Sequence, residues 1–74
     1  MTKNILDKVL VKEGIRKADL VRETNLASST ISKIANFKIV PSPVTMSRIV
    51  IGLNKIVNKE KYRVKDIFPE YDIE

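Results

Sequence analysis

Residues 17–36 restrict the fold of this chain most, because they join two short amphipathic segments through a single turn residue. The apolar residues of this stretch recur at helical spacing on either side of the turn: Leu20, Val21, Leu26, Ile31 and Ile34. Asn25 lies between the segments and tolerates the left-handed backbone conformation that a tight turn requires. The stretch therefore predicts two short helices, over 17–24 and 28–36, that pack against each other through their apolar sides.

A further helix is predicted before this pair. Its apolar positions follow the spacing i, i+1, i+4, i+5: Ile5, Leu6, Val9 and Leu10. The side chain of Asn4 can cap the N-terminus of this helix, with Asp7 at the third helical position. Gly14 is a natural end point, because glycine adopts the left-handed conformation that commonly ends helices.

The clearest helical periodicity in the chain follows Ser42 and Pro43. This pair is a strong start signal, with serine as the N-cap and proline at the first helical position. The apolar residues that follow are spaced by three and four: Met46, Ile49, Val50, Leu53 and Val57. We expect this helix to continue to about Asn58. Residues 59–63 form a charged link, and residues 64–68 predict one further helical turn.

The remaining segment, 37–43, is predicted to be a loop, because its two prolines prevent a continuous helix. It also contains three apolar residues that we expect to pack against the domain: Phe37, Ile39 and Val40. No segment shows a credible strand pattern. The sequence therefore predicts an all-α fold, a compact bundle of about five short helices in a single domain over residues 1–69, followed by a short acidic tail at 70–74.

The charge of the chain is unevenly distributed. The net charge is +5, from 14 Lys or Arg and nine Asp or Glu. Four of the acidic residues lie in the last nine positions, which contain no Lys or Arg: Asp66, Glu70, Asp72 and Glu74. The basic body that remains favours a polyanionic partner such as nucleic acid. Simple solubility is the alternative explanation, because small soluble domains often carry a few net charges.

The composition argues against several classes of function. The chain contains no cysteine and no histidine, which removes disulfides, the usual zinc ligands and the commonest general base. Its two glycines cannot form a glycine-rich phosphate-binding loop. No apolar run is long enough to cross a bilayer, and no secretory signal is recognisable. We therefore expect a cytoplasmic protein without enzymatic activity, metal, cofactor, small-molecule substrate or membrane association.

Four pieces of sequence occur in an order that is typical of one family. They are Lys-Ala-Asp-Leu-Val at 17–21, Asn-Leu-Ala-Ser-Ser-Thr-Ile-Ser-Lys-Ile at 25–34, Pro-Ser at 41–42 and Val-Lys-Asp-Ile-Phe at 64–68. With these pieces, about residues 4–69 resemble the Cro and phage-repressor type of helix-turn-helix domain, the XRE family. A helix-turn-helix pattern alone is a weak signal, and the ordered downstream pieces make it more specific.

The resemblance implies a lambda-repressor-like fold with the helix-turn-helix motif at 17–36. It further implies that the second helix of the motif enters the major groove of double-stranded DNA. The residues implied to lie over base edges are Ser28, Ser29 and Lys33, with Ala27 and Ser32 nearby. The residues implied to contact phosphates are Arg16, Lys17, Asn36 and Lys38. For each of these side chains, an ordinary solvated helix surface is the alternative.

Some positions depart from the pattern of the family. Ala27 and Arg16 stand where a Ser or Thr cap is common, and Ser28 can cap the third helix instead, which would move its start by one residue. Val21 replaces a small alanine where the two helices touch, so these helices can pack slightly further apart. Phe37 stands where glycine often follows the second helix of the motif, and an aromatic ring there can extend the core or mark a surface for a partner.

The sequence thus predicts a sequence-specific DNA-binding transcriptional regulator, in the first instance a repressor that binds a two-half-site operator as a homodimer. The alternative is a protein-interaction module, such as the antitoxin of a toxin–antitoxin pair. Phe37, Ile39, Val40 and residues 62–71 would form its surface. The apolar residues of that last segment fit a dimer surface and a cover of the domain's own core equally well: Tyr62, Ile67, Phe68 and Tyr71. RNA binding has less support, because aromatic residues are scarce.

Overall fold

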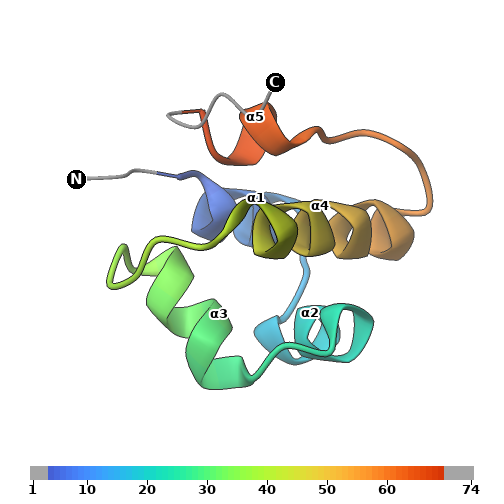
Figure 1. Ribbon diagram of the computed structural model, residues 1–74. Helices are drawn as coiled ribbons and strands as arrows, with labels where there is room; N and C mark the ends of the chain where they lie inside the picture. The colour runs from blue at the N-terminus through green and yellow to red at the C-terminus, as the bar shows by residue number, and fades with distance from the viewer. Residues whose placement is uncertain (1–3, 70–74) are drawn as a thin grey trace.

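A computed structural model describes residues 4–69, which form five helices and no strand (Figure 1). The helices are α1 (Leu6–Glu13), α2 (Lys17–Thr24), α3 (Ser28–Ala35), α4 (Pro43–Val57) and α5 (Val64–Ile67). α4 is the longest helix and contacts both α2 and α5. The helices α2 and α3 lie on one side of α4, and α5 lies on the other (Figure 1). The predicted all-α bundle is confirmed. The predicted acidic tail at 70–74 lies outside the described residues.

The helix ends follow the capping signals in the sequence. Gly14 ends α1 and Asn25 ends α2, both in the left-handed conformation, with φ of 67° and 60°. The Ser42 hydroxyl accepts a hydrogen bond from the Thr45 backbone N–H at 3.3 Å, and Pro43 is the first residue of α4. At the start of α4, the Ser42 side chain satisfies one backbone donor that an isolated helix end would leave unpaired, and Pro43 has no N–H to satisfy.

The start of α1 differs from the prediction by one residue. The prediction that Asn4 is the N-cap is wrong, because Ile5 holds that position without a side-chain cap, although Asn4 Oδ1 accepts a hydrogen bond from the Leu6 N–H at 3.0 Å. The helix itself begins at Leu6, so Asp7 is its second residue and not its third. The Asn4 side chain also donates from Nδ2 to the carbonyl oxygen of Ile34 at 3.0 Å. This second bond fastens the chain before α1 to the C-terminal turn of α3.

The core is built from the apolar faces of the helices. Its buried hydrophobic residues are Leu6, Val9, Leu10, Ile15, Leu20, Ile31, Ile34, Ala35, Met46, Ile49, Val50, Leu53, Ile67 and Phe68. Ile67 and Phe68 are fully buried, and the Ile67 carbonyl accepts a hydrogen bond from the Ile5 N–H at 3.0 Å. The last turn of the domain therefore closes the core beside the start of α1.

The expectation that the loop after α3 packs against the domain is wrong. Phe37, Ile39 and Val40 are exposed, and only Pro41 of the loop is buried. A chain of this size has a small interior, and here the helices together with Phe68 already fill it. The apolar side chains of the loop consequently remain on the surface.

The charged link between α4 and α5 is held down by specific hydrogen bonds. Asn54 Oδ1 accepts from the backbone N–H groups of Lys61 and Tyr62 at 3.1 and 2.9 Å, and its Nδ2 donates to the Tyr62 carbonyl at 3.0 Å. Glu13 of α1 accepts from Lys61 Nζ at 2.7 Å and from the Tyr62 hydroxyl. These bonds connect the link to both α4 and α1, which the sequence reading did not anticipate.

The helices α2 and α4 pack closely together at Gly52. A β-carbon at this position would lie 2.8 Å from Thr24 Cγ2, closer than such atoms pack in proteins. Thr24 cannot turn away easily, because its buried hydroxyl donates to the Leu20 carbonyl at 2.7 Å and accepts from the Leu26 N–H at 3.2 Å. Gly52 is therefore required by packing, although glycine within a helix is intrinsically unfavourable.

We predict that Gly52→Ala lowers the free energy of unfolding by about 1–3 kcal/mol, because the added methyl group forces α2 and α4 apart. At a helix position with free space the same change would stabilise the protein by up to about 1 kcal/mol. Chemical denaturation measures the difference. Thr24→Ser removes the clashing Cγ2 and keeps the hydroxyl, so Gly52→Ala should cost less in that background. An equal cost in both backgrounds would contradict this explanation.

Candidate nucleic-acid interface

The connection between α2 and α3 is short and well anchored. Asn25 donates its backbone N–H to the Val21 carbonyl at 2.8 Å, and Leu26 packs in part against the core. Ile31 and Ile34 direct the apolar side of α3 into the core, where both are fully buried. Because its apolar side and its preceding turn are both fixed, α3 presents its other side to solvent on a rigid support.

The start of α3 shows whether Ala27 or Ser28 is the residue before the helix. Ser28 is its first helical residue, and Ala27 precedes the helix with extended backbone angles, φ of −65° and ψ of 146°. Ser28 therefore does not act as the cap, and no side chain caps this helix. Backbone N–H groups in the first turn of an uncapped helix are available to other acceptors, and the helix dipole favours an anion there.

The residues predicted to read bases lie largely on the exposed side of α3. Ala27, Ser28, Ser29 and Lys33 are exposed, whereas Ser32 is half-buried. The two serines of the first turn and Lys33 in the second follow the spacing i, i+1, i+5, which places them on one side of the helix. Their common surface is polar and basic and contains no acidic side chain. It is open to a partner along the first two turns of α3.

The residues predicted to contact phosphates flank this surface along the chain. Arg16 and Lys17 lie at the start of α2, and Asn36 and Lys38 follow the end of α3. Arg16, Asn36 and Lys38 are exposed, while Lys17 is half-buried. The flexible Lys17 stem can still carry its ammonium group to the surface.

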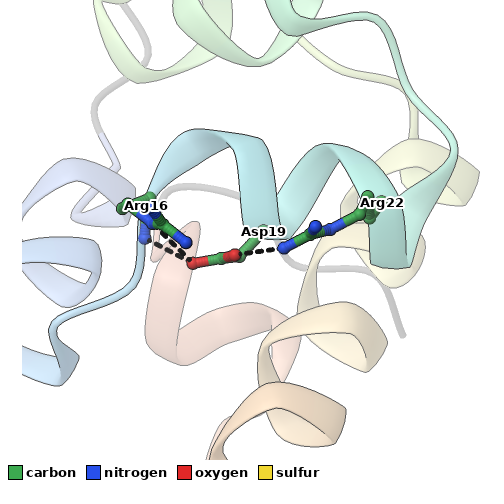
Figure 2. Close-up of polar contacts among 3 residues, drawn as sticks. All are labelled: Arg16, Asp19 and Arg22. Atoms are coloured by element: carbon green, nitrogen blue, oxygen red, sulfur yellow. Dashed lines mark hydrogen bonds and ion pairs between the residues drawn. The ribbon is translucent and has the colours of Figure 1, made fainter.

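Asp19 links Arg16, the residue before α2, to Arg22 within α2, which sequence reasoning missed (Figure 2). One carboxylate oxygen accepts from the Arg16 backbone N–H at 3.1 Å and lies 3.4 Å from Arg16 Nε. The other carboxylate oxygen lies 2.6 Å from Arg22 Nη2. Arg16, Asp19 and Arg22 follow one another at a spacing of three, and this spacing of opposite charges on a helix was the available signal. Both guanidinium groups remain mostly exposed beside the carboxylate.

These contacts lower the pKa of Asp19 below the ordinary value of an aspartate. The main cause is the hydrogen bond from the Arg16 backbone N–H, and the side-chain hydrogen bonds of both arginines and the positive charge of Arg16 add to it. Partial burial of the carboxyl group acts in the opposite direction and raises its pKa. The lowered pKa extends the pH range over which ionised Asp19 pairs with the two arginines.

The alternative surface at the C-terminal end of the domain is largely internal. Ile67 and Phe68 are fully buried, so of the two possibilities left open by the sequence they cover the core of the domain itself. Tyr62 is half-buried and donates its hydroxyl to Glu13. Tyr71 lies outside the described residues. Ile67 and Phe68 therefore do not belong to a surface for a partner.

Within residues 4–69, no group of acidic side chains is arranged so that it could hold a metal ion. None of the five helices combines the length and the apolar character that crossing a membrane would require.

We predict that a carboxyl-carbon NMR titration of Asp19 gives a pKa below the ordinary aspartate value. Because this pKa is depressed in the folded state, ionised Asp19 stabilises the fold above its ordinary pKa, and the stabilisation is lost as the pH falls through the folded-state pKa. The difference in stability between the original protein and Asp19→Asn should therefore shrink on acidification from neutral pH. A difference that stays constant down to pH 2 would contradict the assignment.

Comparison with known proteins finds no established family for this chain. A scan against models of known protein families gives no match, and no curated protein is similar enough in sequence to count as a relative.

Proposed function

We propose that this protein is a sequence-specific DNA-binding regulator whose helix α3 enters the major groove of double-stranded DNA. One observation carries the proposal: α3 is fixed through buried Ile31 and Ile34 and exposes an uncapped, polar first turn together with Lys33 in its second turn. An α-helix fits the width of the major groove, and a helix braced in this way can present side chains to base edges in one defined orientation.

The side chains on the exposed part of α3 suit different base edges. The ammonium group of Lys33 can donate to O6 and N7 of guanine. Ser28 and Ser29 can donate or accept, and the methyl group of Ala27 can contact the methyl group of thymine. Half-buried Ser32 has less freedom to reach a base than the other four residues. Lys33 is therefore the residue that we propose contributes most to sequence preference.

The phosphate backbone would be contacted on both sides of α3. Lys17, Asn36, Lys38 and Arg16 offer donors there, and such contacts orient the protein without reading sequence. Asp19 restrains the Arg16 guanidinium through the hydrogen bond that Nε donates at 3.4 Å, which reduces the side-chain entropy that a phosphate contact would otherwise cost. The net positive charge of +5 would attract the protein to DNA over longer distances.

The fold is consistent with the resemblance of the sequence to XRE-type helix-turn-helix domains. The order of the helices, the left-handed Asn25 between α2 and α3, and the proline-containing loop before α4 are the features that support it. A domain of this size reads few base pairs, so we propose that a homodimer binds an operator with two half-sites. The bound dimer would repress transcription by blocking access of polymerase to the promoter.

A protein-interaction module remains the second candidate function. The observation that favours it is the exposed apolar loop after α3, with Phe37, Ile39 and Val40 on the surface. An antitoxin would use such a surface to hold and neutralise another protein. Co-expression with the products of neighbouring genes, followed by purification, would detect a stable complex of that kind.

We predict that the protein shifts duplex DNA at low salt and that its affinity falls steeply as salt is added. Contacts with about six phosphates per dimer give a slope near −5 in a plot of log affinity against log salt concentration. Binding to a random duplex library, measured over a range of salt concentrations, tests this slope. No binding to any duplex at low salt would exclude the proposed function.

We predict that Lys33→Ala reduces affinity for the selected operator by roughly 1–3 kcal/mol and relaxes the preference at one base pair per half-site. Lys65→Ala is the matched control, because it removes an exposed lysine from α5, on the other side of α4. Selection from a random duplex library with each variant measures the preference. A uniform loss of affinity across all sequences would show that Lys33 contacts phosphate.

A further inference from the structure

The outward side of α4 carries a line of apolar and basic side chains. The opposite side of the helix faces the core and contributes its buried residues: Met46, Ile49, Val50 and Leu53. Exposed residues recur on the outward side at helical spacings of four, three and four: Val44, Arg48, Ile51 and Lys55. We refer to these four residues as the α4 stripe. The stripe rises about 16 Å along the helix, which is about three turns.

The composition of the stripe distinguishes it from an ordinary solvated helix surface. Val44 is 69% exposed and Ile51 is 55% exposed. A single exposed apolar residue is common, but these two lie seven residues apart on one line, a spacing at which one helix anchors another. Residues 43–57 contain Arg48 and Lys55 and no acidic residue. The stripe therefore offers apolar contact and positive charge to the same partner.

The C-terminal part of the stripe opens into a hollow of about 390 Å³. Its lining residues are Ile51, Asn54, Lys55, Asn58, Lys59 and Glu60. The backbone at this end of α4 is already hydrogen-bonded, since the Asn58 N–H donates to the Lys55 carbonyl at 3.2 Å. The side-chain amide of Asn54 is likewise bonded to the link before α5. Binding in the hollow would therefore depend mainly on Ile51 and on the ammonium groups of Lys55 and Lys59.

The positive charges of the stripe and the hollow lack partners within the domain. The ion pairs among residues 4–69 use the carboxylates of Asp19 and Glu13, and none of them involves Arg48, Lys55 or Lys59. A carboxylate from another molecule would consequently meet these cations without displacing an existing partner. Such charge complementarity favours an acidic partner over a neutral or basic one.

The combination of charge and apolar surface decides between the possible occupants. A second copy of the stripe would bring cations against cations. DNA phosphates would pair with Arg48 and Lys55 but offer no apolar surface to Val44 and Ile51. An acidic amphipathic helix supplies both carboxylates and apolar side chains at matching helical intervals.

We propose that the α4 stripe and the adjoining hollow bind an acidic amphipathic helix of a different protein. The apolar side of that helix packs on Val44 and Ile51, and its carboxylates pair with Arg48, Lys55 and Lys59. The surface includes none of the residues proposed to contact DNA and none of the loop after α3. The proposal therefore does not rest on the DNA-binding function.

Fluorescence anisotropy with a labelled synthetic peptide tests the proposal on the full chain. The peptide has roughly 18 residues, or about five helical turns, with leucines at positions i, i+3 and i+7 and glutamates on its other side. The control peptide has the same composition, with the leucines spread around the helix. We expect the amphipathic peptide to bind and the control peptide to bind about tenfold more weakly. No binding of the amphipathic peptide up to about 1 mM would overturn the proposal.

Variants of the stripe locate the binding site. We expect Ile51→Gln to weaken peptide binding about tenfold and Lys55→Gln about threefold, the latter effect shrinking at high salt. Val11→Gln and Lys8→Gln are the matched controls, because both residues are exposed on α1, outside the stripe, and should leave peptide binding unchanged. Circular dichroism establishes that each variant is folded. Equal weakening by the stripe variants and their controls would overturn the proposal.

Two further probes separate other occupants from the proposed one. Vesicles of phosphatidylserine and phosphatidylcholine test a lipid surface, and binding to them that Ile51→Gln weakens, without peptide binding, would overturn the proposal. Duplex DNA tests the overlap with α3, and we expect Ile51→Gln and Lys55→Gln to keep the original affinity for it. Loss of duplex affinity in both variants would assign the stripe to DNA and overturn the proposal. Peptide binding by a chain that binds no duplex would support the stripe and refute the DNA-binding function.

Discussion

The close packing of α2 on α4 is the constraint on which the rest of the structure depends. Gly52 leaves space for the side chain of Thr24. The Thr24 hydroxyl donates to the Leu20 carbonyl within α2 and accepts from the Leu26 N–H in the turn toward α3. The position of α2 determines where α3 begins, and buried Ile31 and Ile34 then determine which side of α3 faces solvent. A small loss of fit between the two helices would therefore be transmitted to the surface proposed to read DNA.

A second connection holds the far end of α3. Asn4 joins the start of α1 to the last turn of α3, and the neighbouring Ile5 joins it to Ile67 at the end of α5. A short segment before α1 thus brings together three helices that are distant in sequence. Asn4 is buried, and both ends of its amide group are hydrogen-bonded, so it fixes α3 without leaving a polar group unpaired.

Much of the secondary structure could be predicted because local chemistry determines it. Gly14, Asn25 and the Ser42–Pro43 pair each stop or start a helix through backbone preferences that act over a few residues. The loop after α3 was predicted, but its packing against the domain was predicted incorrectly, because whether Phe37 and Val40 are buried depends on the space left by distant helices. The pairing of Asp19 with two arginines could have been predicted from the sequence, because the three residues are spaced by three along the chain.

The sequence by itself determined the all-α class, the helix order and the polar composition of α3, because periodicity and capping are local properties of the chain. Only the tertiary structure decided the register of α3, with Ser28 as its first residue, and the burial of Ile67 and Phe68 in the core. It also decided that the apolar loop stays exposed. Each of these outcomes depends on which residues far apart in sequence fill the same limited interior, and hydrophobic periodicity carries no information about that competition.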